Sequence, residues 1–231
     1  MIEFNLIILF VLVAHIGLFI AIAVLNLLLE KEHRKSIENV FYTRFPLEPL
    51  KLDSKLVKPL RILYYIYAGV SFGGLFTVVP LINDFGGAGV FTIAICIIYG
   101  LVSLLMVVNN AVDVYYVKQH VIISTIFMAS SVFASLLATS YGILVFRLWS
   151  RTGEGSAFTL IFAILNGLIS IASIILIVNP RLKDWPKLIK KNESEDEYIR
   201  PKFFPLAYTE WAFIALNFLS FIFFILTLVR M

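Results

Sequence analysis

Six long apolar segments are the feature that most limits how this 231-residue chain can fold. The hydrocarbon core of a bilayer is about 30 Å thick, and roughly 20 residues of α-helix cross it with every backbone hydrogen bond made internally. The segments that meet this requirement are residues 4–29, 62–82, 90–112, 121–146, 157–178 and 206–229. They predict an all-α fold, a polytopic membrane helical bundle with six transmembrane helices that forms one integral membrane domain over residues 1–231.

The composition excludes several other classes of protein. Hydrophobic residues make up 60% of the chain and charged residues only 15%, so a disordered chain is excluded. Cys96 is the only cysteine, which excludes a disulfide scaffold. The first segment does not fit a cleavable signal peptide, because its apolar run is too long and Glu3 stands where such a peptide has basic residues.

The distribution of basic residues predicts the orientation of the chain. With the N-terminus outside, the cytoplasmic loops at residues 30–61 and 179–205, together with the link that contains Lys118, hold all but three of the 19 Lys and Arg residues. Basic residues near membrane spans stay on the cytoplasmic side. We therefore expect both the N-terminus and the C-terminus to be extracytoplasmic. The short loops suggest a prokaryotic cell membrane.

The two cytoplasmic loops predict contacts with lipid. Their basic residues would attract anionic lipid headgroups, and this explains the net charge of +4 without a nucleic-acid partner. Residues 179–191 suit a segment at headgroup level, and the acidic run over residues 193–197 that follows suits a solvated loop. In the first loop, Asp53 or Ser54 is expected to cap a short re-entry helix leading to Pro59.

Small and aromatic residues predict how the helices pack. Gly69 with Gly73 in the second segment, and Ala163 with Gly167 in the fifth, allow close approach of neighbouring helices. The fourth segment carries the most hydroxyl groups and is expected near the centre of the bundle. The sixth segment is rich in phenylalanine and is expected to face lipid.

Three strongly polar residues lie at depth in the predicted spans: His15, Asn166 and Asn217. Polar side chains inside a membrane are costly, so each is a candidate functional residue. If their helices are neighbours, His15 could bond to both amides and form a small site for a proton, a polar headgroup or a quinone carbonyl. The alternative, which we favour, is that each bonds to a nearby hydroxyl or carbonyl group. A haem with two histidine ligands is disfavoured, because His15, His33 and His120 lie at different depths, and no cofactor is predicted.

A second polar cluster lies at the predicted cytoplasmic face. It consists of Asn109, Asn110, Asp113, His120 and Glu210. Asn109 and Asp113 are four residues apart on one helical face, where their oxygens could hold a cation such as Mg²⁺. The competing interpretation, which we favour, is a helix end capped by Asn and Asp.

Catalytic signatures are missing from the sequence. It contains no G-x-S-x-G, H-E-x-x-H, C-x-x-C or phosphate-binding loop. We therefore expect a non-catalytic membrane component or a subunit of a larger membrane complex, with protein partners in that complex. A small transporter or channel is the alternative, and a lipid-active enzyme using Asp113, His120 and Glu210 is a third. A polar cavity would favour transport, and an exposed small-residue face on a tightly packed bundle would favour a subunit.

Overall fold

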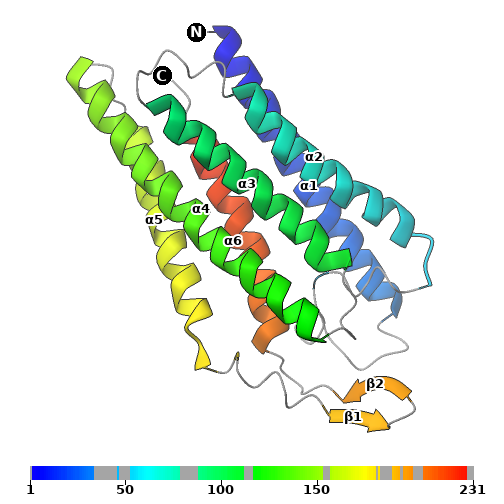
Figure 1. Ribbon diagram of the computed structural model, residues 1–231. Helices are drawn as coiled ribbons and strands as arrows, with labels where there is room; N and C mark the ends of the chain where they lie inside the picture. Colours follow the sequence, from blue (N-terminus) through cyan, green and yellow to red (C-terminus); the bar gives the residue numbers. More distant parts are fainter. Residues whose placement is uncertain are drawn as a thin grey trace.

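The described part of the chain is a bundle of long helices that lie side by side, with a small β-hairpin at one end (Figure 1). The computed structural model describes residues 2–33, 46, 53–78, 88–111, 117–152, 157–180, 182, 189–192, 195–199 and 205–227. The helices are α1 (Ile2–His33), α2 (Val57–Val78), α3 (Ala88–Ala111), α4 (Val117–Thr152), α5 (Ala157–Ile177) and α6 (Pro205–Thr227). The predicted helical membrane bundle is thus confirmed.

Five of these helices are long and apolar enough to cross a membrane. Their spans are Leu6–Glu32, Val90–Val108, Gln119–Arg151, Ala157–Ile177 and Pro205–Thr227. Helix α2 is the sixth helix in the described part of the chain, and it is not among these five. That α2 also crosses the membrane therefore stays a prediction. The beginning of α1 and the end of α6 lie at one end of the bundle, and the hairpin lies at the other (Figure 1).

The start of α2 differs from the predicted re-entry helix. Ser54 does cap a helix, because its Oγ accepts a hydrogen bond from the Leu56 amide at 3.2 Å. That helix is α2 itself, which begins at Val57 and continues through Pro59. Proline is tolerated there because the first turn of a helix has no carbonyl partner for its amides. Ser54 Oγ also donates to Glu32 Oε2 at 2.8 Å, which ties the end of α1 to the start of α2.

Part of the predicted acidic loop forms a β-hairpin. Strands β1 (Ile189–Asn192) and β2 (Glu195–Ile199) pair antiparallel, with Ile189 opposite Ile199 and an irregularity between Lys190 and Asn192. The pattern was missed because these short strands show no alternation of apolar and polar residues.

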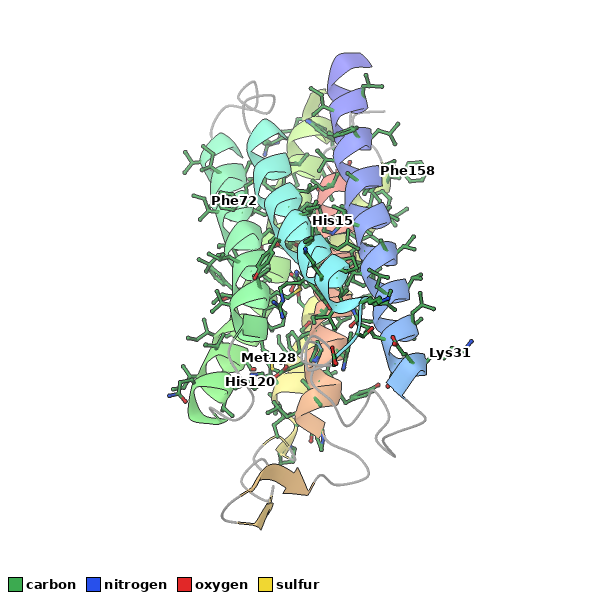
Figure 2. The ribbon with its side chains drawn as sticks, turned by 90° about the vertical axis from the view of Figure 1, so that its right-hand side faces the viewer. His15, Lys31, Phe72, His120, Met128 and Phe158 are labelled. Carbon is green, nitrogen blue, oxygen red and sulfur yellow. The ribbon has the colours of Figure 1, made fainter. Side chains whose placement is uncertain are left out.

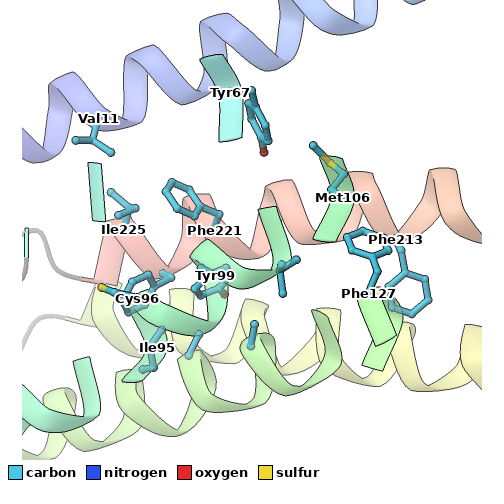
Figure 3. Close-up of a cluster of buried hydrophobic side chains, with 14 of the residues drawn as sticks. Val11, Tyr67, Ile95, Cys96, Tyr99, Met106, Phe127, Phe213, Phe221 and Ile225 are labelled. Atoms are coloured by element: carbon cyan, nitrogen blue, oxygen red, sulfur yellow. The ribbon is translucent and has the colours of Figure 1, made fainter. Parts of the chain in front are cut away.

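The prediction that the sixth segment faces lipid is wrong. Phe213, Phe221 and Phe224 on α6 are completely or almost completely buried, and Phe218 is mostly buried. Figure 3 shows Phe213 and Phe221 among side chains from the surrounding helices. The phenylalanines recur at helical spacing on one side of α6, and in this bundle that side faces the other helices. Aromatic residues suit either lipid or a protein core, so composition does not distinguish the two environments.

The hydroxyl groups of α4 are used mostly within the helix. Helix α4 packs against α3, α5 and α6, as expected for a helix near the centre. Several of its hydroxyls donate to backbone carbonyls three or four residues earlier in the helix, including those of Thr125, Ser131, Thr139 and Ser140. Ser135 Oγ also donates within the helix, to Val132 O at 2.9 Å, and it accepts a hydrogen bond from Ser170 Oγ of α5 at 2.8 Å. Most of the described hydroxyls of α4 are therefore satisfied locally.

Gly142 sets the close approach of α4 to α5, and replacing it with alanine is expected to destabilise the bundle. A Cβ at Gly142 would lie 2.7 Å from Ala163 Cβ and 3.3 Å from Ala163 Cα, and neither atom can rotate away. The helices would have to separate, at a cost of about 1–3 kcal/mol that outweighs the gain in helix propensity of about 1 kcal/mol. Unfolding in sodium dodecyl sulfate measures this change.

The matched control for this prediction is Gly17→Ala. Gly17 lies exposed on α1, and nothing lies within 4 Å of the position of its added Cβ. This variant is expected to be as stable as the parent or slightly more stable. Equal stability of Gly142→Ala and Gly17→Ala would contradict the close contact between α4 and α5.

Candidate functional site

His15 lies buried in the interior, on the side of α1 that faces α2 (Figure 2). Its Nε2 atom lies 3.2 Å from the Tyr67 hydroxyl and its Nδ1 atom lies 3.2 Å from the Ser71 hydroxyl. Tyr67 and Ser71 are one turn apart on α2, so both present a hydroxyl to the same imidazole ring. In a neutral imidazole one nitrogen donates and the other accepts, and the hydroxyls can supply both roles. Both polar atoms of His15 are therefore satisfied within the protein.

Aromatic rings enclose the imidazole of His15. Its centroid lies 4.0 Å from that of Phe221 and 5.1 Å from that of Phe218, both in stacked geometry. The Tyr67 ring lies on another side, with centroids 4.8 Å apart. The stacked rings cover the faces of the imidazole, while the Tyr67 and Ser71 hydroxyls lie at its two nitrogens. The ring serves as a polar link from α1 to α2 and an aromatic contact with α6.

Asn166 belongs to a different polar group, which joins three other helices. The side-chain amide of Asn166 on α5 lies 2.6 Å from Ser220 Oγ on α6. Ser220 Oγ lies 2.5 Å from the Tyr99 hydroxyl on α3. All three residues are almost completely buried. The chain of contacts therefore fixes α5, α6 and α3 to one another in the bundle interior.

Asn217 takes part in neither group. It lies on α6 and is 7% exposed, and its Oδ1 atom has no hydrogen-bond partner among the described residues. The three predicted residues are thus not joined: the structure contains no described hydrogen bond between His15 and Asn166 or Asn217. His15 bonds instead to hydroxyls of α2, because the rotation of α1 turns this residue toward that neighbour.

The second predicted cluster is partly brought together. Glu210 on α6 is 1% exposed, and its Oε1 atom lies 3.1 Å from His120 Nε2 on α4. Ser124, one turn further along α4, donates to the same oxygen at 2.6 Å. The side chains of Asn109 and Asn110, and all of Asp113, lie outside the described residues. The magnesium hypothesis for Asn109 and Asp113 therefore stays untested.

The order of groups in this cluster does not suit nucleophilic catalysis. An activated serine donates its proton to a histidine, which a carboxylate then orients. Here the Ser124 hydroxyl donates a hydrogen bond to Glu210 Oε1, and His120 Nε2 lies within hydrogen-bond distance of the same oxygen. The arrangement is instead that of a buried polar link between α4 and α6.

Asn26 is a buried polar residue that the sequence analysis missed. It lies on α1, is 8% exposed, and donates from Nδ2 to Ile22 O at 2.9 Å and to the Tyr64 hydroxyl at 3.0 Å. Its Oδ1 atom has no partner among the described residues. The signal was present, since Asn26 falls inside the predicted first span. That signal was weak, because Asn26 lies near the end of the span, where water usually satisfies a side-chain amide.

Most of the buried polar residues in the described interior therefore form hydrogen bonds that join one helix to a neighbouring helix. His15 and Asn26 join α1 to α2, Ser170 joins α5 to α4, and Glu210 joins α6 to α4. No known protein family, no curated protein and no solved structure matches this chain.

Proposed function

We propose that this chain is a non-catalytic component of a larger membrane complex, in which a transmembrane helix of a partner subunit docks on the outer face of α2. This face consists of Ile62, Tyr65, Ile66, Gly69 and Gly73. The observation that carries the proposal is the exposure of both glycines: among the residues that the structure describes, none has an atom within 4 Å of a Cβ built on either one.

Two other glycines, Gly100 and Gly142, lie against neighbouring helices. A Cβ at Gly142 would meet Ala163, and one at Gly100 would overlap the ring of Phe72. Small residues in membrane helices permit close backbone approach, which gains van der Waals contact that lipid does not replace. The bundle uses Gly100 and Gly142 in this way. Gly69 and Gly73 have the spacing of a packing motif, and no described helix of this chain lies against them.

The cost of glycine supports a role for this face outside the monomer. A glycine in a helix interior destabilises it by about 1 kcal/mol relative to alanine. Gly69 and Gly73 recover none of this through packing within the described chain. A helix that docks over these two glycines would recover it, because the two backbones could approach closely.

Exposed apolar side chains continue the outer face of α2. Ile62, Tyr65 and Ile66 are each about half exposed, and with Gly69 and Gly73 they follow one side of the helix at spacings of three and four residues. A partner helix would thus find apolar side chains beside two small residues. This combination is typical of contacts between membrane helices.

Basic residues gather at the end of the bundle where α1 ends and α2 begins. Lys31, Lys55, Lys58 and Arg61 are exposed there. Figure 2 shows Lys31 pointing away from the helices. Under the proposal this is the cytoplasmic end, and its basic residues lie at the level of anionic lipid headgroups, which would help to orient the subunit.

Transport and catalysis have less support. A path for ions or polar solutes needs polar groups that face a hydrated cavity, whereas His15, Asn166 and Glu210 bond to neighbouring helices. The buried Ser124, His120 and Glu210 also lack the order of contacts needed for nucleophilic attack. The bundle resembles a packed structural component more than a conduit or an active site.

Affinity purification in mild detergent tests the proposal. The tagged chain and its Gly69→Leu/Gly73→Leu variant are expressed in the host, and co-purifying proteins are quantified by mass spectrometry. We expect the parent chain to retain a membrane partner in near-stoichiometric amount and the double variant to lose it, since two leucine side chains block the close approach.

Gly17→Leu is the matched control, because Gly17 is also exposed and its Cβ also meets open space. This variant should keep the partner. Recovery of the parent chain as a monomer without an enriched membrane protein would refute the proposed function. Equal recovery of the partner with the double variant would exclude the outer face of α2 as the contact.

A further inference from the structure

A cavity of about 190 Å³ lies between α1, α2, α3 and α6, and its surface is almost entirely apolar. Ile22 of α1, Tyr67 of α2 and Met106 of α3 are among the residues that line it. Figure 3 shows Tyr67 and Met106 on their two helices. The cavity is separate from the outer face of α2, because no residue of that face lines it.

The polar side chains of Asn26, Tyr64 and Tyr67 in the lining are used within the protein. Asn26 Nδ2 donates to Ile22 O at 2.9 Å and to the Tyr64 hydroxyl at 3.0 Å. The Tyr67 hydroxyl lies 3.2 Å from His15 Nε2. Asn26 Oδ1 is fully buried and so presents no surface to the cavity. The cavity therefore offers apolar contact to a ligand and not hydrogen bonds.

The cavity lies beside an aromatic contact between α1 and α6. Phe19 of α1 stacks on Phe218 of α6, with ring centroids 3.7 Å apart. One turn further along α1, Ala23 lines the cavity, and so does Ala215 of α6. An alanine projects only a methyl group from its helix. Large rings thus join α1 to α6 at Phe19 and Phe218, whereas the small side chains of Ala23 and Ala215 leave space.

The cavity opens onto the lipid-facing surface of the bundle. Ala23 and Ala215 are exposed as well as lining the cavity, so it reaches the surface between α1 and α6. Both helices are among those that are long and apolar enough to cross a membrane. Val24 and Leu27 of α1 and Leu219 of α6 are exposed apolar residues on the same two helices. The cavity is therefore continuous with a surface that lipid chains cover.

The apolar lining favours lipid over water as the occupant. Side chains around an empty space lose the van der Waals contacts that close packing provides. Water does not restore them, because a buried water molecule needs several polar partners and apolar cavities stay dry. Methylene groups restore these contacts, and they lose no hydration when they enter from the bilayer.

The size of the cavity limits which part of a lipid would enter. An apolar cavity of about 150 Å³ is large enough for a benzene ring. This cavity is of similar size, so it would admit several methylene groups of a chain but not a fused-ring sterol. The described lining contains no Lys, Arg, His, Asp or Glu. A headgroup would lose its hydration there without gaining a counter-ion, so it would stay outside.

We propose that a segment of an acyl chain of a bilayer phospholipid occupies this cavity, entering from the membrane between Ala23 and Ala215. The chain fills the space between α1 and α6 next to the stacked rings of Phe19 and Phe218. The site recognises the chain and not the headgroup. This inference goes beyond the proposed subunit role and does not depend on a partner at the outer face of α2.

Photolabelling of the full chain in phosphatidylcholine vesicles tests this site. A phosphatidylcholine with a diazirine near the end of one acyl chain is included as a trace component, and labelled residues are located by mass spectrometry after irradiation. Met106 is the informative position, because it lines the cavity and is only 4% exposed. We expect Met106 to be labelled, since a chain in the cavity lies against it.

Leu104 and Met128 are the reference positions. Leu104, on the same helix as Met106, is 56% exposed, so the surrounding bilayer labels it whether or not the cavity is occupied. Met128 of α4 is as buried as Met106 and does not line the cavity. Labelling of Met106 should clearly exceed that of Met128. Equal labelling of the two methionines, with Leu104 labelled, would overturn the proposal.

Variants of the opening locate the path of the chain. Ala215→Phe places a ring at the opening and should reduce labelling of Met106 to the level of Met128, with labelling of Leu104 unchanged. Ala94→Phe is the matched control, because Ala94 is exposed on α3 and does not line the cavity. If Ala215→Phe does not fold, Ala23→Leu replaces it. Full labelling of Met106 in a folded variant of the opening would contradict entry between α1 and α6.

The position of the diazirine and the type of head distinguish the chain from the headgroup. A probe with its diazirine in the headgroup should leave Met106 unlabelled. Phosphatidylcholine and phosphatidylglycerol probes with the same labelled chain should give the same ratio of Met106 to Leu104 labelling. Labelling of Met106 from the headgroup, or a ratio that changes with the head, would overturn recognition of the chain alone. Because the chain is labelled without other proteins, these outcomes are independent of the test for a partner subunit.

Discussion

Glu210→Ala is expected to lower the free energy of unfolding by about 3 kcal/mol, one of the two largest effects of any single substitution considered for this bundle. Glu210 Oε1 lies 2.6 Å from Ser124 Oγ and 3.1 Å from His120 Nε2, and all three side chains are buried. Alanine would remove the acceptor shared by both groups and leave a space between α4 and α6. Unfolding by sodium dodecyl sulfate in mixed micelles, followed by circular dichroism, measures the loss.

Two further variants divide this effect into its parts. Glu210→Gln keeps the volume and one acceptor oxygen, so it should lose less than half as much stability as Glu210→Ala. Ser124→Ala removes one hydrogen bond and should cost about 1 kcal/mol. Ser140→Ala, at an exposed position of α4, is the control. If Glu210→Ala were as stable as Ser140→Ala, the link between α4 and α6 would be absent.

The same variants separate a structural role from a catalytic one. A catalytic carboxylate can usually be replaced with loss of activity and little loss of stability. A carboxylate that joins two helices shows the reverse pattern. Glu210→Gln that remained folded but abolished a measured lipid-modifying activity would favour the enzyme alternative over a membrane subunit.

His15→Ala is expected to destabilise the bundle by about 3 kcal/mol for a different reason. The imidazole fills a space bounded by the rings of Tyr67, Phe218 and Phe221, with centroids 4.8, 5.1 and 4.0 Å away. Alanine would leave a cavity at the place where α1, α2 and α6 meet. Detergent unfolding should show an earlier transition with the native helix content unchanged before it.

His15→Phe distinguishes packing from hydrogen bonding. Phenylalanine restores a ring among the aromatic neighbours and removes the contacts with the Tyr67 and Ser71 hydroxyls. Hydrogen bonds between membrane helices contribute about 0.6 kcal/mol each on average, so we expect a loss of about 1 kcal/mol. A loss as large as that of His15→Ala would show that the polar contacts dominate.

His15→Phe also bears on the site hypothesis for this residue. If His15 carried a proton or bound a polar group, its replacement would remove an activity that the phenylalanine ring cannot supply. Full function in a stable His15→Phe variant would leave only the structural role, in which the imidazole joins α1 to α2.

The sequence alone predicted much of the helical architecture. The length of each apolar run must match the bilayer, and this requirement located the segments that became α1 to α6, five of them apolar and long enough to span. A cap at Asp53 or Ser54 was also predicted, and Ser54 is the residue that caps, although the helix it caps is α2 and not a short re-entry helix. These features depend on residues close together in the chain.

Predictions about helix faces were less successful. The phenylalanines of α6 were expected in lipid, yet Phe213 and Phe224 are fully buried. In a membrane both the outside and the inside of a bundle are apolar, so hydrophobicity does not indicate which face of a helix is covered. The exposed position of Gly69 and Gly73 could not be predicted either, because the same spacing serves contacts within or between chains.

The sequence by itself determined that this is a membrane bundle and which segments form its helices. Only the tertiary structure decided that His15 is hydrogen-bonded to Tyr67 and Ser71, and that Ser124 and His120 both contact the Glu210 carboxylate. It also revealed the cavity beside Asn26. The physical reason is that a helix forms from local hydrogen bonds, whereas the partner of a buried polar group depends on the rotation of two helices that are distant in sequence.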